Sequence, residues 1–407
     1  MLTRDKRPVG RAKTRAEPIV DLARLRRDRL GKVQRQMAVS QIGALVLTDI
    51  VNIRYCSGVS VMPLWTAVNM AHYVVVPVEG DPVIFEYGGA EFRAREFWPD
   101  VRPSMFWQAR VTDADSPGKA MAWAQQIKDV LHERGLADAR VAIDVLDFNG
   151  FTALQALGIE LTDADRTMSA ARIIKLPAEI ELMRESCAIA EAALHQMEQA
   201  IRPGISENEL LATFWHRMLA LGGEHCFSRL VVSGHKTNPW FHEAGSKRVA
   251  PGDLVAIDTD MIGPECYVCD ISRTFLCGDA ASAAQKEAYK VAYDFVQGCM
   301  ELIKPGRAFS DFVARCPPLP AAYREQAYGV IVHGIGTDDE SPNVPLPGDP
   351  HTEMPDGEFQ ENMVVAVECY AGKVGAKDGV KLEDEVWVTA AGPVVLSLYP
   401  YESKLLG

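Results

Sequence analysis

Carboxylates stand at the ends of apolar runs that are typical of buried strands. The run 254–257 leads into Asp258 and Asp260, and the run 364–367 leads into Glu368. An unpaired carboxylate in a protein core is costly, so acids in such places are normally paired or bound to a metal. The fold must therefore bring these strand ends to a shared polar site.

Two further acids and one histidine also lie beside apolar runs. Asp270 falls on the expected returning strand of a hairpin, Glu383 precedes the strand 386–388, and His333 ends an apolar run next to glycines. Cations of the iron and manganese type bind several carboxylate oxygens and often one imidazole. Such a set can hold two cations, because bridging carboxylates screen their repulsion. Each acid alone could belong to the surface or to an ion pair, but their shared setting predicts a metal site.

The N-terminal part of the chain alternates helical and strand patterns. A chain of 407 residues is too long for one ordinary core, so two domains are expected. In the first domain we expect apolar strands at residues 43–47, 73–77, 82–85 and 140–144. Helices are expected at residues 24–41 and 121–134. This alternation predicts an α/β domain over residues 21–165.

A second domain is expected over residues 172–407. Apolar residues follow a three-four spacing from 180 to 201, which predicts a long amphipathic helix. A Pro-Gly pair ends this helix, and Ser206 with Glu209 forms a capping box for the next one. The same Ile-x-Pro-Gly signal recurs at 303–306. It predicts an internal duplication whose two halves bring strands to a central cleft.

Charge and apolar patterns exclude several classes of partner. The formal net charge is −13, whereas nucleic-acid-binding surfaces are basic, so no nucleic-acid partner is expected. No apolar run approaches the roughly 18 residues that span a bilayer, so no membrane association is expected. Residues 1–20 are basic and lack the apolar stretch of a secretory signal. We expect them to form a disordered tail, with a transit peptide as the alternative.

The cysteines follow no disulfide framework. Their number, nine, is odd and they are scattered, which favours a reducing cytoplasm. Cys266 and Cys269 form a C-x-x-C pair without a second pair. A zinc site would need further ligands at a familiar spacing, so both are expected to be ordinary strand residues.

The motifs together resemble the family of creatinase, prolidase and aminopeptidase P. Residues 172–180 resemble the start of its catalytic domain, and its metal-ligand motifs follow in order at Asp258, Asp270, His333, Glu368 and Glu383. The resemblance covers nearly the whole chain after about residue 20. It implies an α/β (α+β) fold with a creatinase-like N-terminal domain and a duplicated, pseudo-twofold pita-bread domain. It also implies a dinuclear metal centre and a homodimer.

The sequence departs from the peptidases of this family in informative places. Asp258 and Asp270 are one position farther apart than their counterparts, and Asp260 adds an acid. Glu340 stands where the peptidases have a second histidine that contacts the substrate. Their other substrate-side histidine is matched by His242.

A second set of residues resembles the DddP branch of this fold, whose members are dimethylsulfoniopropionate (DMSP) lyases. The set comprises residues 52–55 and 237–241 with Trp65, Asp260, Tyr328 and Asp339. The resemblance implies that Asp260 is a sixth metal ligand, Asp339 the catalytic base and Tyr328 a neighbour of the substrate. His242 and Ser341 stand where this branch is expected to have glutamine and tryptophan. Because both lie near the expected pocket, the sequence supports membership of the branch more strongly than it supports the substrate.

A lyase needs a base for the proton next to the substrate carboxylate. Metals that neutralise this carboxylate make the proton more acidic, and a free carboxylate can accept it. Asp339 is the candidate base, with a solvated loop acid as the alternative interpretation. Aromatic faces bind sulfonium cations as they bind quaternary ammonium groups. Trp240, Tyr328 and Trp65 are therefore candidates to contact the sulfonium of the substrate, with ordinary core residues as the alternative interpretation. His242 joins them as a substrate-side residue.

A metallopeptidase of the Xaa-Pro dipeptidase or aminopeptidase type is the alternative function. It needs a metal-activated hydroxide and a group that protonates the departing amine. The absence of the second histidine weakens this alternative, whereas His242 favours it. A non-catalytic binder is a third class, which the retention of all five principal ligands disfavours. We therefore predict a lyase that cleaves DMSP to dimethyl sulfide and acrylate by β-elimination.

The ligand chemistry also limits the choice of cofactor. Six oxygen-rich ligands favour iron or manganese over zinc. We expect two metal ions, with iron first and manganese, zinc or cobalt as the alternatives, in a cytoplasmic homodimer.

Overall fold

The computed structural model describes residues 2–9, 18–60, 62, 69–112 and 115–407. The chain divides into two compact units. The N-terminal unit is Asp21–Arg172, and the C-terminal unit combines Met1–Val20 with Ile173–Gly407. The boundary thus follows the helix that ends at Arg172.

A mixed six-stranded sheet forms the centre of the N-terminal unit, in the order β5-β4-β3-β2-β6-β7. Its strands are β2 (Ala44–Leu47), β3 (Tyr73–Pro77), β4 (Val83–Glu86), β5 (Val101–Pro103), β6 (Val141–Ile143) and β7 (Leu161–Asp163). The helices are α1 (Leu22–Val39), α2 (Ile50–Ser57), α3 (Phe92–Arg95), α4 (Ala109–Thr112), α5 (Ser116–Glu133), α6 (Phe148–Ala156) and α7 (Asp165–Arg172). The predicted α/β character is confirmed.

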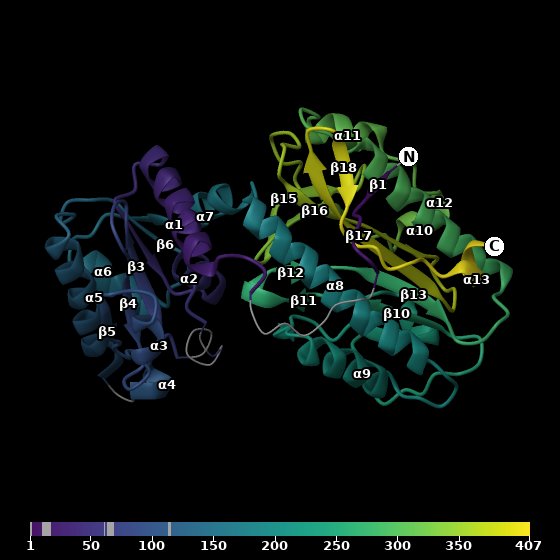
Figure 1. The fold of residues 1–407 in the computed structure, drawn as a ribbon, viewed down its shortest axis with the longest axis horizontal. Coiled ribbons are helices and arrows are strands. Elements are labelled where there is room, and N and C mark those ends of the chain that lie inside the picture. The colour runs from purple at the N-terminus through teal and green to yellow at the C-terminus, as the bar shows by residue number, and fades with distance from the viewer. Residues whose placement is uncertain (1, 10–17, 61, 63–68, 113–114) are drawn as a thin grey trace. The chain divides into compact units, whose positions relative to one another are not determined.

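Helices cover both faces of this sheet, because successive strand residues point to opposite sides. Leu45 and Leu47 pack with apolar residues of α1 and α7, whereas Ala44 and Val46 pack with α5 and α6. Figure 1 shows the strands between these helices. A strand buried on both faces needs a continuous apolar run, which is why β2 is visible in the sequence.

In the described part of the C-terminal unit, the strands form three sheets. The largest has the order β1-β18-β17-β16-β14-β15, and the others are β13-β10-β9 and β12-β11-β8. The first comprises β1 (Thr3–Arg4), β14 (Val330–Ile335), β15 (Asp339–Pro345), β16 (Val364–Gly372), β17 (Gly379–Thr389) and β18 (Gly392–Val395). The smaller sheets comprise β8 (His225–Cys226), β9 (Val231–Ser233), β10 (Leu254–Asp258), β11 (Met261–Ile262), β12 (Val268–Cys269) and β13 (Ser272–Leu276).

Two helix pairs precede the strands of the two main sheets. The pairs are α8 (Pro177–Ala200) with α9 (Glu207–Ala220), and α10 (Ala283–Leu302) with α11 (Phe309–Arg315), while the short α12 (Ala321–Arg324) and α13 (Ser403–Leu406) follow later. The predicted capping box is confirmed: Glu209 N donates to Ser206 Oγ at 3.2 Å, and Ser206 N donates to Glu209 Oε2 at 2.8 Å. This repeated order of helices and antiparallel strands is the expected pita-bread duplication.

Alternation along β16 and β17 sorts their side chains between an apolar core and a polar face. Val367, Cys369 and Leu382 belong to the core cluster that includes residues of α10. Glu368 and Glu383 are their sequence neighbours and therefore project to the opposite face. The two glutamates are also register partners across the antiparallel pair, so their side chains start side by side.

The sheet β13-β10-β9 lies against β17 (Figure 1). Thr274 Oγ1 donates to Lys381 O at 2.9 Å and accepts from Lys381 N at 3.2 Å. Arg273 Nη1 donates to Glu383 O at 2.7 Å. These bonds from β13 side chains to the β17 main chain bring the end of β10 next to the polar face of β17.

The N-terminal tail requires a correction. A disordered tail was expected over residues 1–20, but β1 pairs in parallel with β18. Arg7 donates to both carboxylate oxygens of Glu191, at 2.8 and 2.6 Å. The Glu191 side chain is fully buried on α8, and the arginine supplies the cation that a buried carboxylate needs. The rest of the expected tail, residues 10–17, lies outside the described residues.

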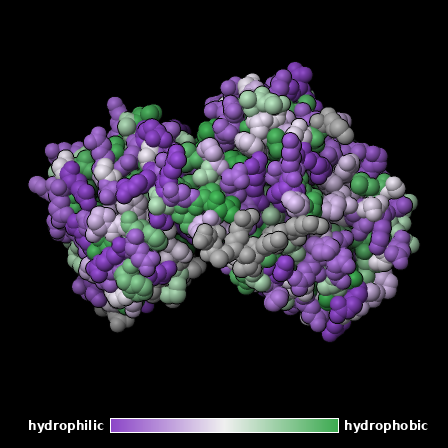
Figure 2. Space-filling model, viewed as in Figure 1, coloured by the Kyte–Doolittle hydropathy of each residue, from purple (hydrophilic) through white to green (hydrophobic). Residues whose placement is uncertain are grey.

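Hydrophilic residues cover most of the face seen in Figure 2, and hydrophobic residues are scattered among them. Within the described ranges, no helix combines the length and the apolar composition needed to cross a bilayer.

Candidate metal centre

His333 on β14 lies at the centre of an acidic cluster. Its Nε2 atom is 3.2 Å from Glu383 Oε1, 3.6 Å from Glu368 Oε1 and 3.9 Å from Asp270 Oδ2. Its Nδ1 atom is 3.7 Å from Asp339 Oδ1. Both ring nitrogens of the imidazole therefore face carboxylates that come from other strands or loops.

Asp258 and Asp270 join the cluster from the smaller sheets. Asp258 ends β10, and Asp270 lies between β12 and β13. One carboxylate oxygen from each, together with one from Glu383, lies within 4.8 Å of the others. Asp258 Oδ1 also accepts a hydrogen bond of 2.6 Å from Ser272 Oγ. The five residues predicted as principal ligands are thus gathered where the sheets meet.

The donor set fits a pair of bound cations. Asp270 Oδ1 is buried and has no hydrogen-bond partner among the described residues. Burial and neighbouring acids raise the pKa of Asp258 and of Asp270, and burial raises the pKa of Glu368 to about 8. Several buried carboxylates this close repel one another, and cations would relieve that repulsion. The ligand roles themselves stay predictions.

A lysine inside the cluster was not predicted. Lys381 Nζ lies 3.1 Å from Asp258 Oδ2, 2.8 Å from Glu368 Oε2 and 3.0 Å from Glu383 Oε2. Burial alone would raise the pKa of Glu383, but Lys381 and the hydrogen bond with His333 hold it well below its usual range. The signal was present in the sequence, because Lys381 and Glu383 are two positions apart on one strand and so share a face.

Asp260 does not continue the strand that ends at Asp258. Residues two positions apart on one strand share a face, so a longer β10 would have placed Asp258 and Asp260 on the same side. Instead, β10 ends at Asp258, and Asp260 has a left-handed backbone with φ of 35°. Burial, followed by the charge of Asp258, raises the pKa of Asp260 to about 7, with smaller effects of Glu383 and Asp339. The charges of these acids act on the Asp260 carboxylate, and its role as a sixth ligand stays a prediction.

The neighbours Asp339 and Glu340 have opposite environments. The Asp339 side chain is 63% exposed, although its carboxylate lies beside His333 and Asp270. The Glu340 side chain is buried and forms an ion pair of 2.6 Å with Lys175. A Cβ atom on Gly336 would lie 2.5 Å from Glu340 Oε1, so the glycine is needed for this close approach. Glu340, at the position of the second peptidase histidine, is thus held by Lys175.

We expect the buried pair of Lys175 and Glu340 to hold the start of β15, where Asp339 lies. Both side chains are 2% exposed, so Lys175→Ala would leave Glu340 buried without its cation and should lower the free energy of unfolding by about 3–5 kcal/mol. The double variant Lys175→Met with Glu340→Leu removes both charges and should recover much of that loss. Urea unfolding of the full chain measures both.

The exposed pair of Lys290 and Asp294 provides the matched control. Its side chains are 66% and 54% exposed, so Lys290→Ala should change stability little. If Lys175→Ala were as mild as Lys290→Ala, the buried pair would not hold the start of β15.

The aromatic residues proposed for the substrate lie beside Lys381. Its Nζ atom is 6.0 Å from the ring centre of Trp240 and 5.8 Å from that of Tyr328. The Tyr328 ring also meets the exposed Phe241 ring at 5.5 Å between centres. The sequence did not single out Phe241 itself as a substrate residue.

His242 and Trp65 are the other two predicted substrate residues. His242 is exposed, and within the described part of the chain no hydrogen bond or ion pair links it to the acidic cluster. Trp65 lies outside the described residues.

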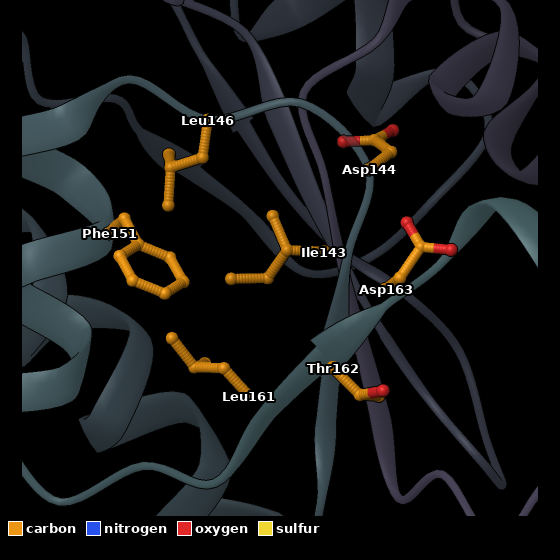
Figure 3. A pocket seen from close by; sticks show the side chains of 7 residues that line it. All are labelled: Ile143, Asp144, Leu146, Phe151, Leu161, Thr162 and Asp163. Carbon is orange, nitrogen blue, oxygen red and sulfur yellow. The ribbon is translucent and has the colours of Figure 1, made fainter.

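A hollow of about 350 Å³ lies between β6, β7 and α6 of the N-terminal unit (Figure 3). It is lined by Ile143, Asp144, Leu146, Phe151, Leu161, Thr162 and Asp163. Asp144 accepts hydrogen bonds from Thr48 N at 2.9 Å and Asp49 N at 3.1 Å. Burial raises the pKa of Asp144 to about 6. The carboxylate thus fixes the turn between β2 and α2, and we assign no chemistry to this hollow.

The sequence matches two family descriptions over the two units. Metallopeptidase family M24 matches residues 181–390, and the creatinase/prolidase N-terminal domain matches residues 29–174. The chain belongs to metallopeptidase family M24. The predicted relationship to creatinase, prolidase and aminopeptidase P is confirmed, and this M24 chain is an enzyme of that family.

Relatives of this M24 chain include lyases and peptidases. It is 31% identical over 398 residues to the dimethylsulfoniopropionate lyase DddP of Roseovarius nubinhibens. The aligned region covers 95% of this chain and 89% of that protein. It is 29% identical over 239 residues to the Xaa-Pro dipeptidase of Pyrococcus furiosus, which covers 57% of this chain and 65% of that protein. The prolidase structure from Pyrococcus horikoshii matches with a TM-score of 0.74 at 23% identity, covers 92% of this chain and 99% of that one, and shows the shared fold.

Proposed function

We propose that the protein is a metal-dependent lyase that cleaves DMSP to dimethyl sulfide and acrylate. The similarity to a DMSP lyase over 95% of the chain supports this proposal. The observation that carries it is the position of Asp339. This carboxylate is accessible to solvent, yet it lies beside His333 and Asp270 in the predicted metal centre.

The proposed reaction needs one base and one electron sink. Cations held by the predicted ligands, with iron as our first expectation, would neutralise the substrate carboxylate and make the adjacent C–H bond more acidic. Asp339 accepts that proton, and the electron pair of the C–H bond forms the carbon–carbon double bond. The C–S bond breaks at the same time and its electron pair stays on sulfur. The products are acrylate, neutral dimethyl sulfide and a proton on Asp339.

We propose that the sulfonium lies against Tyr328 and Phe241 rather than deep beside Trp240. Trp240 is 7% exposed and packs on Tyr370, with 6.0 Å between ring centres. Tyr328 and Phe241 meet at an angle of 64° and Phe241 is exposed, so this pair offers an aromatic surface to the solvent side.

A peptidase of the Xaa-Pro type is the second candidate, because a relative with that activity is 29% identical over part of the chain. Two features weigh against it. Glu340 replaces the second histidine and is ion-paired with Lys175, and His242 is exposed with no link to the acidic cluster among the described residues. A group that could protonate a departing amine is therefore replaced at one of the two expected positions, and at the other the histidine has no such link to the cluster.

A direct substrate comparison tests the proposal. The purified, metal-loaded wild type is offered DMSP with headspace detection of dimethyl sulfide, and in parallel a panel of Xaa-Pro dipeptides. We expect dimethyl sulfide and acrylate in equal amounts and no dipeptide hydrolysis. Hydrolysis of a dipeptide without dimethyl sulfide release would replace the lyase proposal by the peptidase alternative.

A further inference from the structure

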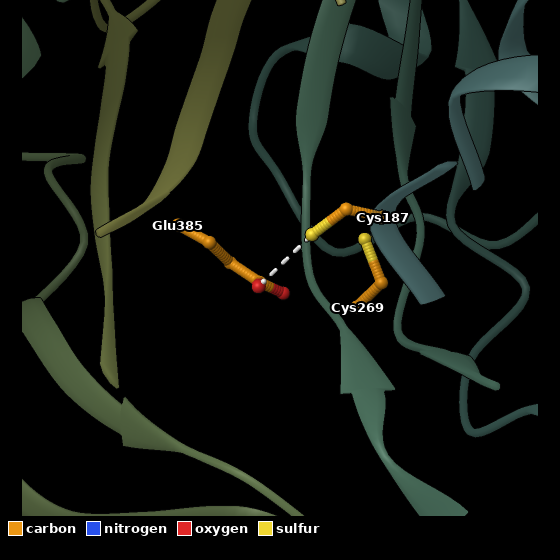
Figure 4. Close-up of side chains that lie close together, drawn as sticks. All are labelled: Cys187, Cys269 and Glu385. Atoms are coloured by element: carbon orange, nitrogen blue, oxygen red, sulfur yellow. Dashed lines mark hydrogen bonds between the residues drawn. The ribbon is translucent and has the colours of Figure 1, made fainter. Parts of the chain in front are cut away.

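Two cysteines and a glutamate meet in the core of the C-terminal unit, outside the acidic cluster (Figure 4). Cys187 lies on α8, Cys269 on β12 and Glu385 on β17. The two sulfur atoms and one carboxylate oxygen lie within 4.8 Å of one another, and Cys187 Sγ donates to Glu385 Oε2 at 3.2 Å. All three residues are completely buried. Figure 4 shows the side chains converging from three separate elements.

The carboxylate in this group is bound by neutral donors, and Arg7, whose charge also acts on it, is itself bound to Glu191. Glu385 Oε1 accepts the main-chain N–H of Asp270 at 2.7 Å, and Oε2 accepts the thiol. Among the described residues, no lysine, arginine or histidine forms an ion pair with Glu385. A buried carboxylate normally has a cation nearby, because desolvation of an isolated charge is costly. A cation bound between the carboxylate and the two sulfurs would meet this need.

The donor atoms indicate which cation would bind. Two thiolates with one carboxylate suit zinc and other thiophilic divalent ions, whereas the oxygen-rich acidic cluster suits harder ions. Zinc lies about 2.3 Å from thiolate sulfur and about 2.0–2.2 Å from carboxylate oxygen, so donors within 4.8 Å of one another can share one ion. Three protein ligands leave a fourth position for water.

We propose that Cys187, Cys269 and Glu385 bind one thiophilic divalent cation, with zinc as the first expectation. The site joins α8, β12 and β17. The Asp270 main-chain N–H donates a hydrogen bond to Glu385, which links the site to Asp270. Glu385 is also two positions from Glu383 on β17, so the two glutamates share a strand face. The cation would therefore fix the strand ends that carry two of the predicted ligands of the acidic cluster. The proposal does not depend on the reaction catalysed.

The C-x-x-C pair does not form this site. Cys269 lies in β12 as expected, but Cys266 Sγ is directed to Thr337 O at 3.7 Å. The second sulfur comes instead from Cys187 on a helix far away in the sequence.

Cation titration of the full-length protein tests the site. The protein is stripped with a chelator under reducing conditions and titrated with Co²⁺ or Cd²⁺ while the near-ultraviolet spectrum is recorded. Thiolate-to-metal charge transfer arises only where sulfur binds the ion. We expect a saturable band in the wild type whose final intensity corresponds to one thiolate-bound ion per chain. We expect Cys187→Ser and Cys269→Ser to lose this band. Asp270→Ala should retain it, because the acidic cluster has no sulfur ligand.

Further variants keep the test decisive if the cysteine variants do not fold. Glu385→Gln keeps both sulfurs, and we expect it to retain the band with at least about tenfold weaker binding, since one anionic ligand is lost. Circular dichroism checks the fold of each variant. Absence of the band in the folded wild type, or an unchanged band in Cys187→Ser and Cys269→Ser, would overturn the proposal. A Cys187–Cys269 disulfide that persists under the reducing conditions would overturn it as well.

Discussion

Asp270→Ala is expected to remove metal from the acidic cluster and to reduce turnover to background while the protein stays folded. Asp270 contributes a buried oxygen without a hydrogen-bond partner, and its carboxylate is close to those of Asp258 and Glu383. In metal-free protein these acids repel one another. This repulsion, together with burial, raises the pKa of Asp270. Removal of one acid should therefore not unfold the metal-free chain. Elemental analysis and DMSP turnover measure the two effects.

An exposed aspartate provides the control for this prediction. Asp279 has a side chain that is 99% exposed, so Asp279→Ala should keep both the metal content and the activity of the wild type. Full turnover by metal-free Asp270→Ala protein would show that the reaction does not need the predicted centre. Loss of the folded state in chelator, checked by circular dichroism, would mean that Asp270 has a structural role instead.

Asp339→Asn is expected to lower the rate of dimethyl sulfide release by about two to four orders of magnitude, the usual range for loss of a general base. The change keeps the size of the side chain and removes the proton acceptor. Because the Asp339 side chain is 63% exposed and lies at the edge of the cluster, the metal content should stay unchanged. Steady-state kinetics should place the effect mainly in kcat, since the substrate carboxylate would be bound elsewhere.

The neighbouring residue separates the role of a base from that of charge alone. Asp338→Asn removes the same charge one position away and should reduce kcat far less than Asp339→Asn. Equal losses in the two variants would indicate a general electrostatic effect. Loss of metal in Asp339→Asn would instead indicate that Asp339 is a metal ligand. The distance of 3.7 Å between His333 Nδ1 and Asp339 Oδ1 does not by itself imply a ligand role.

The strands that carry the predicted ligands could be located from local pattern. The apolar runs before Asp258 and Glu368 correspond to β10 and β16, and the run around His333 corresponds to β14. A buried strand needs apolar residues on both faces, so a carboxylate within it stands out in the sequence. The five principal candidates were recognised from this contrast, and the structure gathers them in one cluster.

Where a feature depends on contacts between residues distant in sequence, the prediction was wrong or no prediction was made. The basic composition of the N-terminus predicted disorder. Composition describes only local preference, however, and Arg7 is bound by the buried Glu191. The spacing of Lys381 from Glu383 was visible in the sequence, but its contacts with Asp258 and Glu368 were not, because these acids come from other strands. The Cys187 and Cys269 pair was invisible for the same reason, since a helix and a strand bring the sulfurs together.

The two-part α/β organisation, the repeated helix signals and the acids that cannot remain unpaired in a core could be predicted from local pattern, because they follow from periodicity and burial. Which side chains meet depends on how the folded chain brings distant strands together. Asp260 follows the end of β10 with a left-handed backbone and does not continue the strand. Asp339 stays exposed while Glu340 is drawn in by Lys175. Such choices between neighbouring residues depend on partners from other strands, and no local pattern encodes them.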